Sequence, residues 1–169
     1  MDVVLAIDGT GSMRSSIAQA QRDGERLIAG LREVTSDLRV GVVVFRDYRN
    51  PGGEYELLQA LTGDDASVQT ALQQVRAVSN RDPGNGAAES YSLLFRKSYS
   101  DSAVGWRPGA RKVLVVIGEA EPYGAGAAGL AGCRNQAPDP HGLRATDELA
   151  RLRAKGIVLL MVRETSTET

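Results

Sequence analysis

Two residue types that define common classes of protein are scarce in this sequence. It has one cysteine, Cys133, and one histidine, His141. A single cysteine excludes an internal disulfide framework, and the pair is too small for a zinc site, which generally uses three or four nitrogen or sulfur ligands. A Cys–His catalytic pair would also need a third group to orient the base. We therefore interpret the segment that carries both residues as a surface loop.

Strong charge imbalance and long apolar runs are also missing. The formal net charge is −1 over 169 residues, so the overall charge does not indicate nucleic acid or an anionic membrane as a partner. No apolar stretch approaches the roughly 20 residues of a membrane-spanning helix. The length suits one domain. We expect a single domain over residues 1–169, located in the cytoplasm.

What the sequence does contain is a series of short apolar runs separated by helical patterns. Four runs rich in β-branched residues predict strands buried on both faces, at residues 2–7, 39–45, 112–117 and 157–162. A weaker alternating run at 55–58 predicts an edge strand. Between them, apolar residues at spacings of three and four predict helices that contain Ile17 to Val34, Val68 to Val75, Tyr91 to Phe95, and Leu143 to Ala154.

This alternation of strands and helices predicts an α/β fold with a doubly wound, mostly parallel sheet and helices on both faces. The loops are uneven in length. Long, glycine-rich loops follow the carboxyl ends of the strands, at residues 46–54, 79–88 and 118–142. Because ligands bind at the carboxyl ends of strands in open α/β sheets, we expect the functional site at that edge.

The first predicted strand ends in Asp8-Gly9-Thr10-Gly11-Ser12, and several kinds of site use a turn of this composition. A dinucleotide site needs G-x-G-x-x-G, but Arg14 stands at the third glycine, and no P-loop sequence is present. An aspartyl-phosphate phosphatase needs a carboxylate as nucleophile two residues before Asp8. That position is Ala6, so the chemistry fails.

A hard-cation site fits the turn better. Asp8, Thr10 and Ser12 offer one charged and two neutral oxygens at alternate positions, and Mg²⁺ binds oxygen ligands with few carboxylates. Gly9 and Gly11 would let the backbone fold tightly, so that these oxygens converge. The alternative is that the Ser and Thr side chains only cap the following helix. Both interpretations stay open at this point.

The residues 8–13, D-G-T-G-S-M, resemble the D-x-[ST]-x-S motif of von Willebrand factor type A domains. Residues 42–49 and 115–122 resemble further strand ends of bacterial members of this family. The resemblance implies a Rossmann-like fold and a metal-ion-dependent adhesion site with Asp8, Thr10 and Ser12 as ligands. It also implies a sixth strand and a closing helix after residues 157–162, for which the remaining residues 163–169 carry no pattern.

The resemblance implies two further ligands, and this sequence departs from the family at both. The loop before the third helix normally supplies a threonine or aspartate, but Gly86 is the matching residue; Asn85 or Asp82 would then offer the oxygen. In the loop after residue 117, Glu119 takes the place of an aspartate. The expected metal ligands are therefore Asp8, Thr10, Ser12, Glu119 and Asn85, and the expected ion is Mg²⁺, with Mn²⁺ or Ca²⁺ as alternatives.

The function that follows from this resemblance is a non-enzymatic protein-binding module. The ion would accept an Asp or Glu carboxylate from a partner protein, as in adhesion or scaffold domains. Two alternatives remain open. One is a metal-dependent hydrolase or phosphatase of the same architecture, and the other is a scaffold domain whose altered site no longer binds metal.

Overall fold

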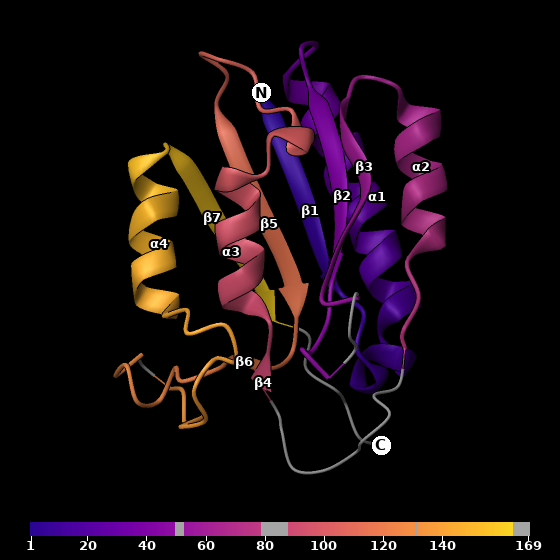
Figure 1. The fold of residues 1–169 in the computed structure, drawn as a ribbon. Coiled ribbons are helices and arrows are strands. Elements are labelled where there is room, and N and C mark those ends of the chain that lie inside the picture. The colour runs from indigo at the N-terminus through magenta and orange to yellow at the C-terminus, as the bar shows by residue number, and fades with distance from the viewer. Residues whose placement is uncertain (50–52, 79–87, 131, 164–169) are drawn as a thin grey trace.

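The computed structural model describes residues 1–49, 53–78, 88–130 and 132–163. Its centre is a five-stranded sheet in the order β3-β2-β1-β5-β7 (Figure 1). The strands are β1 (Asp2–Asp8), β2 (Arg39–Phe45), β3 (Tyr55–Thr62), β5 (Lys112–Gly118) and β7 (Ile157–Arg163). All pairs are parallel except β2 with β3, which is antiparallel. The predicted α/β fold, the four main strands and the weaker edge strand are confirmed.

In the described part of the chain, four α-helices cover the two faces of the sheet. They are α1 (Ile17–Val34), α2 (Asp65–Gln74), α3 (Tyr91–Ser100) and α4 (Ala145–Ala154). A 3₁₀ turn, η1 (Gly11–Ser15), precedes α1, and another, η2 (Ser102–Val104), follows α3. One apolar core lies under α1 and α2, and a second lies under α3 and α4 (Figure 1). Within the described part of the chain, no helix is long and apolar enough to span a membrane.

The side chains of β1 alternate between these two cores because successive residues of a strand point to opposite faces. Val3, Leu5 and Ile7 contribute to the core under α1 and α2. Val4 and Ala6 contribute to the core under α3 and α4. Asp8 continues the second series, so its side chain belongs to the face that α3 covers, at the carboxyl end of the central strand.

A second, much smaller sheet lies at this carboxyl end, where sequence patterns gave no sign of strands. β4 (Ala88–Glu89) pairs in parallel with β6 (Glu121–Pro122), and both appear below the end of β5 in Figure 1. Two-residue strands are too short to show a hydrophobic period. Their pairing joins the start of α3 to the loop that follows β5.

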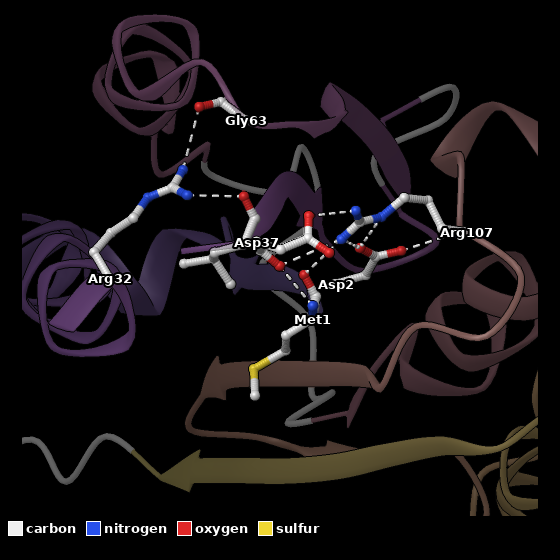
Figure 2. A network of polar contacts seen from close by, with 7 residues as sticks. Met1, Asp2, Arg32, Asp37, Gly63 and Arg107 are labelled. Carbon is white, nitrogen blue, oxygen red and sulfur yellow. Dashed lines mark hydrogen bonds and ion pairs between the residues drawn. The ribbon is translucent and has the colours of Figure 1, made fainter. Parts of the chain in front are cut away.

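The opposite, amino end of the sheet is tied together by one arginine (Figure 2). Arg107 donates from its backbone N–H and from Nε to the two carboxylate oxygens of Asp2, each at 2.8 Å. It also pairs with Asp37 at 2.5 Å and donates to the carbonyl of Met1 at 3.2 Å. This network joins the start of β1 to the loop before β2 and the loop before β5, and it leaves the buried Asp2 carboxylate fully paired.

Candidate functional site

The site begins where β1 ends, between the carboxyl ends of β2 and β5. Asp8 is fully buried there. Its Oδ1 accepts hydrogen bonds from the Thr10 backbone N–H at 2.9 Å and from the Thr10 hydroxyl at 2.7 Å. The Thr10 hydroxyl lies 3.1 Å from the Ser12 hydroxyl. The structure therefore brings the three expected oxygens together in one turn.

Helix capping, the alternative explanation of this turn, does not account for its side chains. Thr10 is the N-cap of η1 and Ser16 is the N-cap of α1, and neither side chain makes a capping hydrogen bond. Thr10 is buried and turned to Asp8, whereas Ser12 is exposed. The hydroxyls thus face Asp8 and solvent, and the helix start does not use them.

The second oxygen of Asp8 is the unusual feature of the turn. Oδ2 is buried and has no hydrogen-bond partner within the described part of the chain. Burial raises the pKa of Asp8 from 3.8 to about 6; the Thr10 hydrogen bonds oppose this rise, and the nearby Glu119 charge adds to it. A buried, unpaired carboxylate oxygen is costly. It is the kind of group that a bound cation would satisfy.

A second buried carboxylate, Glu89 of β4, faces the same turn, and sequence reasoning missed it. Glu89 is only 4% exposed, and its Oε2 also has no partner among the described residues. Burial, and then the charges of Asp8 and Asp47, raise its pKa from 4.5 to about 9, while Arg49 and a hydrogen bond with Thr10 lower it. Thr10 thus contacts both Asp8 and Glu89.

Sequence reasoning missed Glu89 because it expected a different residue of the loop before α3 to be the ligand. The expected ligand there was Asn85, beside Gly86, and both lie outside the described residues. Glu89 stands four residues after Asn85, in the run Ala87-Ala88-Glu89-Ser90. A lone acidic residue among small residues just before a helix was the available hint. What sets its position is the pairing of β4 with β6, which no local pattern reveals.

Glu119, another expected ligand, follows β5 and is partly buried. It lies close enough to Asp8 for its charge to raise the pKa of that residue. The structure therefore places Glu119 at the same edge as Asp8, Thr10, Ser12 and Glu89. Acidic residues at the end of β1, in β4 and after β5 thus lie near one another, although they are far apart in the sequence.

Asp47, after β2, is also buried beside this group, but its charge is already compensated. Its Oδ1 accepts hydrogen bonds from the Tyr123 hydroxyl at 2.7 Å and from the Arg49 backbone N–H at 3.1 Å. The Arg49 guanidinium pairs with its Oδ2. In return, the Tyr48 hydroxyl donates to Asp139 at 2.7 Å. These reciprocal Tyr–Asp pairs hold the loop after β2 against the loop after β6.

Two glycines of the site are required for space. A Cβ on Gly9 would lie 2.6 Å from Val44 Cγ1, and one on Gly118 would lie 2.5 Å from the Tyr91 hydroxyl and 3.3 Å from Asp8 Oδ2. Neither Gly9 nor Gly11 has a positive φ. The oxygens of the turn do converge, and at Gly9 the reason for glycine is close packing and not a left-handed backbone.

The donor set suits a hard cation and no other metal class. Carboxylates and hydroxyls are the ligands of Mg²⁺, Mn²⁺ and Ca²⁺. Among the described residues, no group of three or more His, Cys, Asp and Glu side chains could hold a metal ion, so any ion here would depend on Thr10 and Ser12 as well. His141 lies against the Tyr48 ring, with a centroid distance of 4.8 Å, and takes no part in the turn.

The fold and this edge of the sheet define a class of binding domain with a central parallel sheet and its site at the strand ends. The chain belongs to the von Willebrand factor type A domain family, whose model matches residues 2–164. This family is often involved in adhesion and protein interaction, and its members are typically not enzymes.

One curated relative is "Integrin beta-like protein B" of Dictyostelium discoideum. It is 23% identical over 117 residues, which cover 69% of this chain and 6% of that protein. Among solved structures, the three N-terminal domains of the type V pili tip protein Mfa5 from Porphyromonas gingivalis match with a TM-score of 0.53 and 17% identity, over 70% of this chain and 19% of that one. The chain thus spans a small part of either protein, and the second likeness concerns the fold alone.

Proposed function

We propose that this domain binds a partner protein through a divalent cation. Asp8, Thr10, Ser12 and Glu89, with Glu119, would hold Mg²⁺, or Mn²⁺ or Ca²⁺, and the cation would accept an Asp or Glu carboxylate of the partner. One observation carries the proposal. Among the described residues, the buried carboxylates of Asp8 and Glu89 each keep one oxygen without a hydrogen-bond partner, and both interact with Thr10.

The energetic argument concerns these two carboxylates. Burial of an ionised carboxylate without a partner costs several kcal/mol, and two such groups side by side repel each other. Their raised pKa values express this cost. A divalent cation would remove both the cost of burial and the repulsion between the carboxylates, because it compensates their charge and binds their free oxygens. The bound ion would supply a fixed positive charge for a partner carboxylate.

The two alternatives have less support. A hydrolase would need a nucleophile or a base beside the ion, but Ala6 occupies the position that a phosphatase would use, and His141 lies against Tyr48. A metal-free scaffold would leave the carboxylates of Asp8 and Glu89 buried without compensation. Asn85, expected as a further ligand, remains part of the proposal, because its segment lies outside the described residues.

Isothermal titration with Mg²⁺ and Mn²⁺ tests the metal site directly. We expect one ion per domain and a loss of at least about tenfold in affinity for Asp8→Asn, which keeps the shape of the side chain but removes its charge. Glu33→Gln is the matched control, because it removes an exposed carboxylate of α1 and should leave the affinity unchanged. Equal heats for the wild type and Asp8→Asn would contradict the assignment.

The second half of the proposal concerns the partner carboxylate. With Mn²⁺ bound, acetate or a short acidic peptide should displace water from the ion, and the relaxation rate of the water protons should fall. The matching amides, acetamide or the Asn/Gln peptide, should not have this effect. If no carboxylate changed the water proton relaxation rate of the Mn²⁺-loaded domain, this mode of partner binding would be contradicted.

A further inference from the structure

A pocket of about 280 Å³ lies between the loop after β6 and the start of α4. The buried side chains of Leu143 and Ala145 line it, together with three small residues, Gly124, Ala127 and Ala128. In Figure 1 this loop lies below the start of α4, at the same end of the sheet as β4 and β6. Sites for whole small molecules have volumes of roughly 300–1,000 Å³, so this pocket suits an apolar side chain better.

Hydrogen bonds fix the loop that forms one wall of the pocket. Glu121 Oε2 accepts from the backbone N–H groups of Arg134 at 2.6 Å and Asn135 at 2.7 Å. Asn135 Oδ1 in turn accepts from the N–H groups of Gly124 at 3.2 Å and Ala137 at 3.0 Å. The wall is therefore ordered before any ligand arrives, which lowers the entropic cost of binding.

The polar groups of the pocket lining are unsuited to a cationic ligand. Asp139 Oδ1 accepts from the N–H groups of His141 at 2.8 Å and Leu143 at 3.2 Å, and its Oδ2 accepts from the Tyr48 hydroxyl at 2.7 Å. Both oxygens of this buried carboxylate thus have partners. The exposed Arg144 also lines the pocket and adds a positive charge, so the lining is apolar with a basic edge.

Tyr123 connects the pocket with the candidate metal site. Its side chain lines the pocket, and its hydroxyl donates to Asp47 at 2.7 Å. Burial raises the pKa of Tyr123, and the charges of Asp47 and Glu89 add to this rise. The ring also lies 5.4 Å from the Tyr48 ring, measured between centroids. The pocket therefore continues from the acidic group that was proposed to hold the ion.

We propose that this pocket binds an apolar side chain of the partner, next to the carboxylate that binds the ion. The partner segment would carry an Asp or Glu within a few residues of a Leu, Ile, Met or Val. Such a segment suits the cation and the basic edge at Arg144 by charge, and it suits the pocket by its apolar side chain. This inference rests on the cation-dependent function proposed above, and it names the class of partner.

Short acetylated peptides test this inference on the wild-type domain. Each peptide carries one Asp and one Leu, separated by zero, one or two glycines, in either order. Calorimetry measures their binding to the Mn²⁺-loaded domain. For at least one spacing, we expect about tenfold tighter binding than for the same peptide with Gly in place of Leu, because the pocket buries apolar area. Equal affinities of the Leu and Gly peptides at every spacing would overturn the inference.

A third peptide series, with Lys in place of Leu, tests the chemistry of the pocket. The lining predicts no gain over the Gly peptide, because the acceptors of Asp139 are occupied and Arg144 repels a second cation. Lys peptides that bind as tightly as the Leu peptides would show that the pocket does not select apolar side chains.

Ala127→Phe tests the location, because it places a large ring on the pocket lining. Ala127 is exposed, so the fold should tolerate this change, and the Leu peptide should lose its advantage over the Gly peptide. Ala150→Phe is the matched control: it adds the same ring at an exposed position of α4 outside the pocket lining, and it should keep the advantage. An advantage that survives Ala127→Phe would contradict the assignment of the pocket.

The same titrations distinguish this inference from the proposed function. A wild type that binds neither Mg²⁺ nor Mn²⁺ would overturn both together. A wild type that binds the ion and the carboxylate peptides, but without any preference for Leu over Gly, would overturn this inference alone.

Discussion

Asp2 and Asp8 are both fully buried aspartates of β1, but their carboxylates differ in their hydrogen bonds. Both oxygens of Asp2 accept hydrogen bonds from Arg107. Among the residues that the structure describes, Asp8 has partners on one oxygen only. The two carboxylates are equally buried, but their oxygens differ in hydrogen bonding. This difference indicates that Asp2 is a structural residue and that Asp8 has an oxygen which can still bind a ligand.

The pKa of Asp8 leads to a prediction about the metal-free domain. Because the value in the fold is raised from 3.8 to about 6, the folded state favours the protonated form. The cost of the buried charge is absent below about pH 4 and complete above about pH 6, where it reaches about 3 kcal/mol. Asp8→Asn should therefore raise the free energy of unfolding near neutral pH and change it little at about pH 4.

Urea denaturation in the presence of EDTA, at several pH values, measures this difference. Glu89→Gln should act in the same direction over the wider window from 4.5 to about 9. Excess Mg²⁺ should reverse the order, since it stabilises only the form that binds it. A metal-free Asp8→Asn variant less stable than the wild type near neutral pH would show that Asp8 is a structural residue.

The sequence predicted the part of the site that is local. Asp8, Thr10 and Ser12 lie within five residues at the end of a recognisable strand, so their proximity follows from chain geometry. Glu89 lies 81 residues after Asp8, on a strand of two residues, and its position depends on tertiary pairing with β6. Local patterns contain no information about such a contact.

At the scale of elements, the long strands and helices were predictable because their core-facing residues repeat with a regular period. α1 shows this best: Ala20, Gly24 and Ile28 recur every four residues, and all are buried. β3 was harder, because it is an edge strand whose side chains are mostly only partly buried. β4 and β6 were missed, since two residues cannot show a period.

Glycines at two places in these elements should respond to alanine in opposite directions. Gly30 lies in the exposed part of α1, and a Cβ there would meet nothing within 4 Å. Gly30→Ala should therefore stabilise the domain by about 0.5–1 kcal/mol, through helix propensity alone. Gly9→Ala should destabilise it, because the new Cβ would lie 2.6 Å from the buried Val44 side chain.

Chemical denaturation of both variants measures the two effects. The Mg²⁺ affinity of Gly30→Ala should equal that of the wild type, since α1 contributes no ligand. If Gly9→Ala proved as stable as Gly30→Ala, the close approach of Gly9 to Val44 of β2 would be contradicted.

At the scale of the whole molecule, the two ends of the sheet have different electrostatic character. The amino end has the paired network of Asp2, Asp37 and Arg107 (Figure 2). The carboxyl end has Asp8 and Glu89, each with an oxygen that has no partner in the described part of the chain. β1 has seven residues, which separates the two ends by about 20 Å. We infer that one end contributes stability and the other contributes binding.

Asp2→Ala tests this division. It should lower the free energy of unfolding by about 1–3 kcal/mol, because it removes the acceptor of several Arg107 hydrogen bonds, and it should leave the Mg²⁺ affinity unchanged. At this distance its effect on stability should add to that of Asp8→Asn. A coupling well above the error, or a large loss of Mg²⁺ binding in Asp2→Ala, would show that the ends are not independent.

The position of β1 in the sheet also has a consequence for biosynthesis. One neighbour of β1, the strand β2, follows it after about 30 residues. The other neighbour, β5, lies much further along the chain, where Lys112 pairs with Asp2. Contacts so distant along the chain form late, because the intervening loop must close first. While the ribosome is still making residues 46–111, β1 has one edge without its partner. During that interval the growing chain is open to pairing with foreign strands, and it should depend most on chaperones.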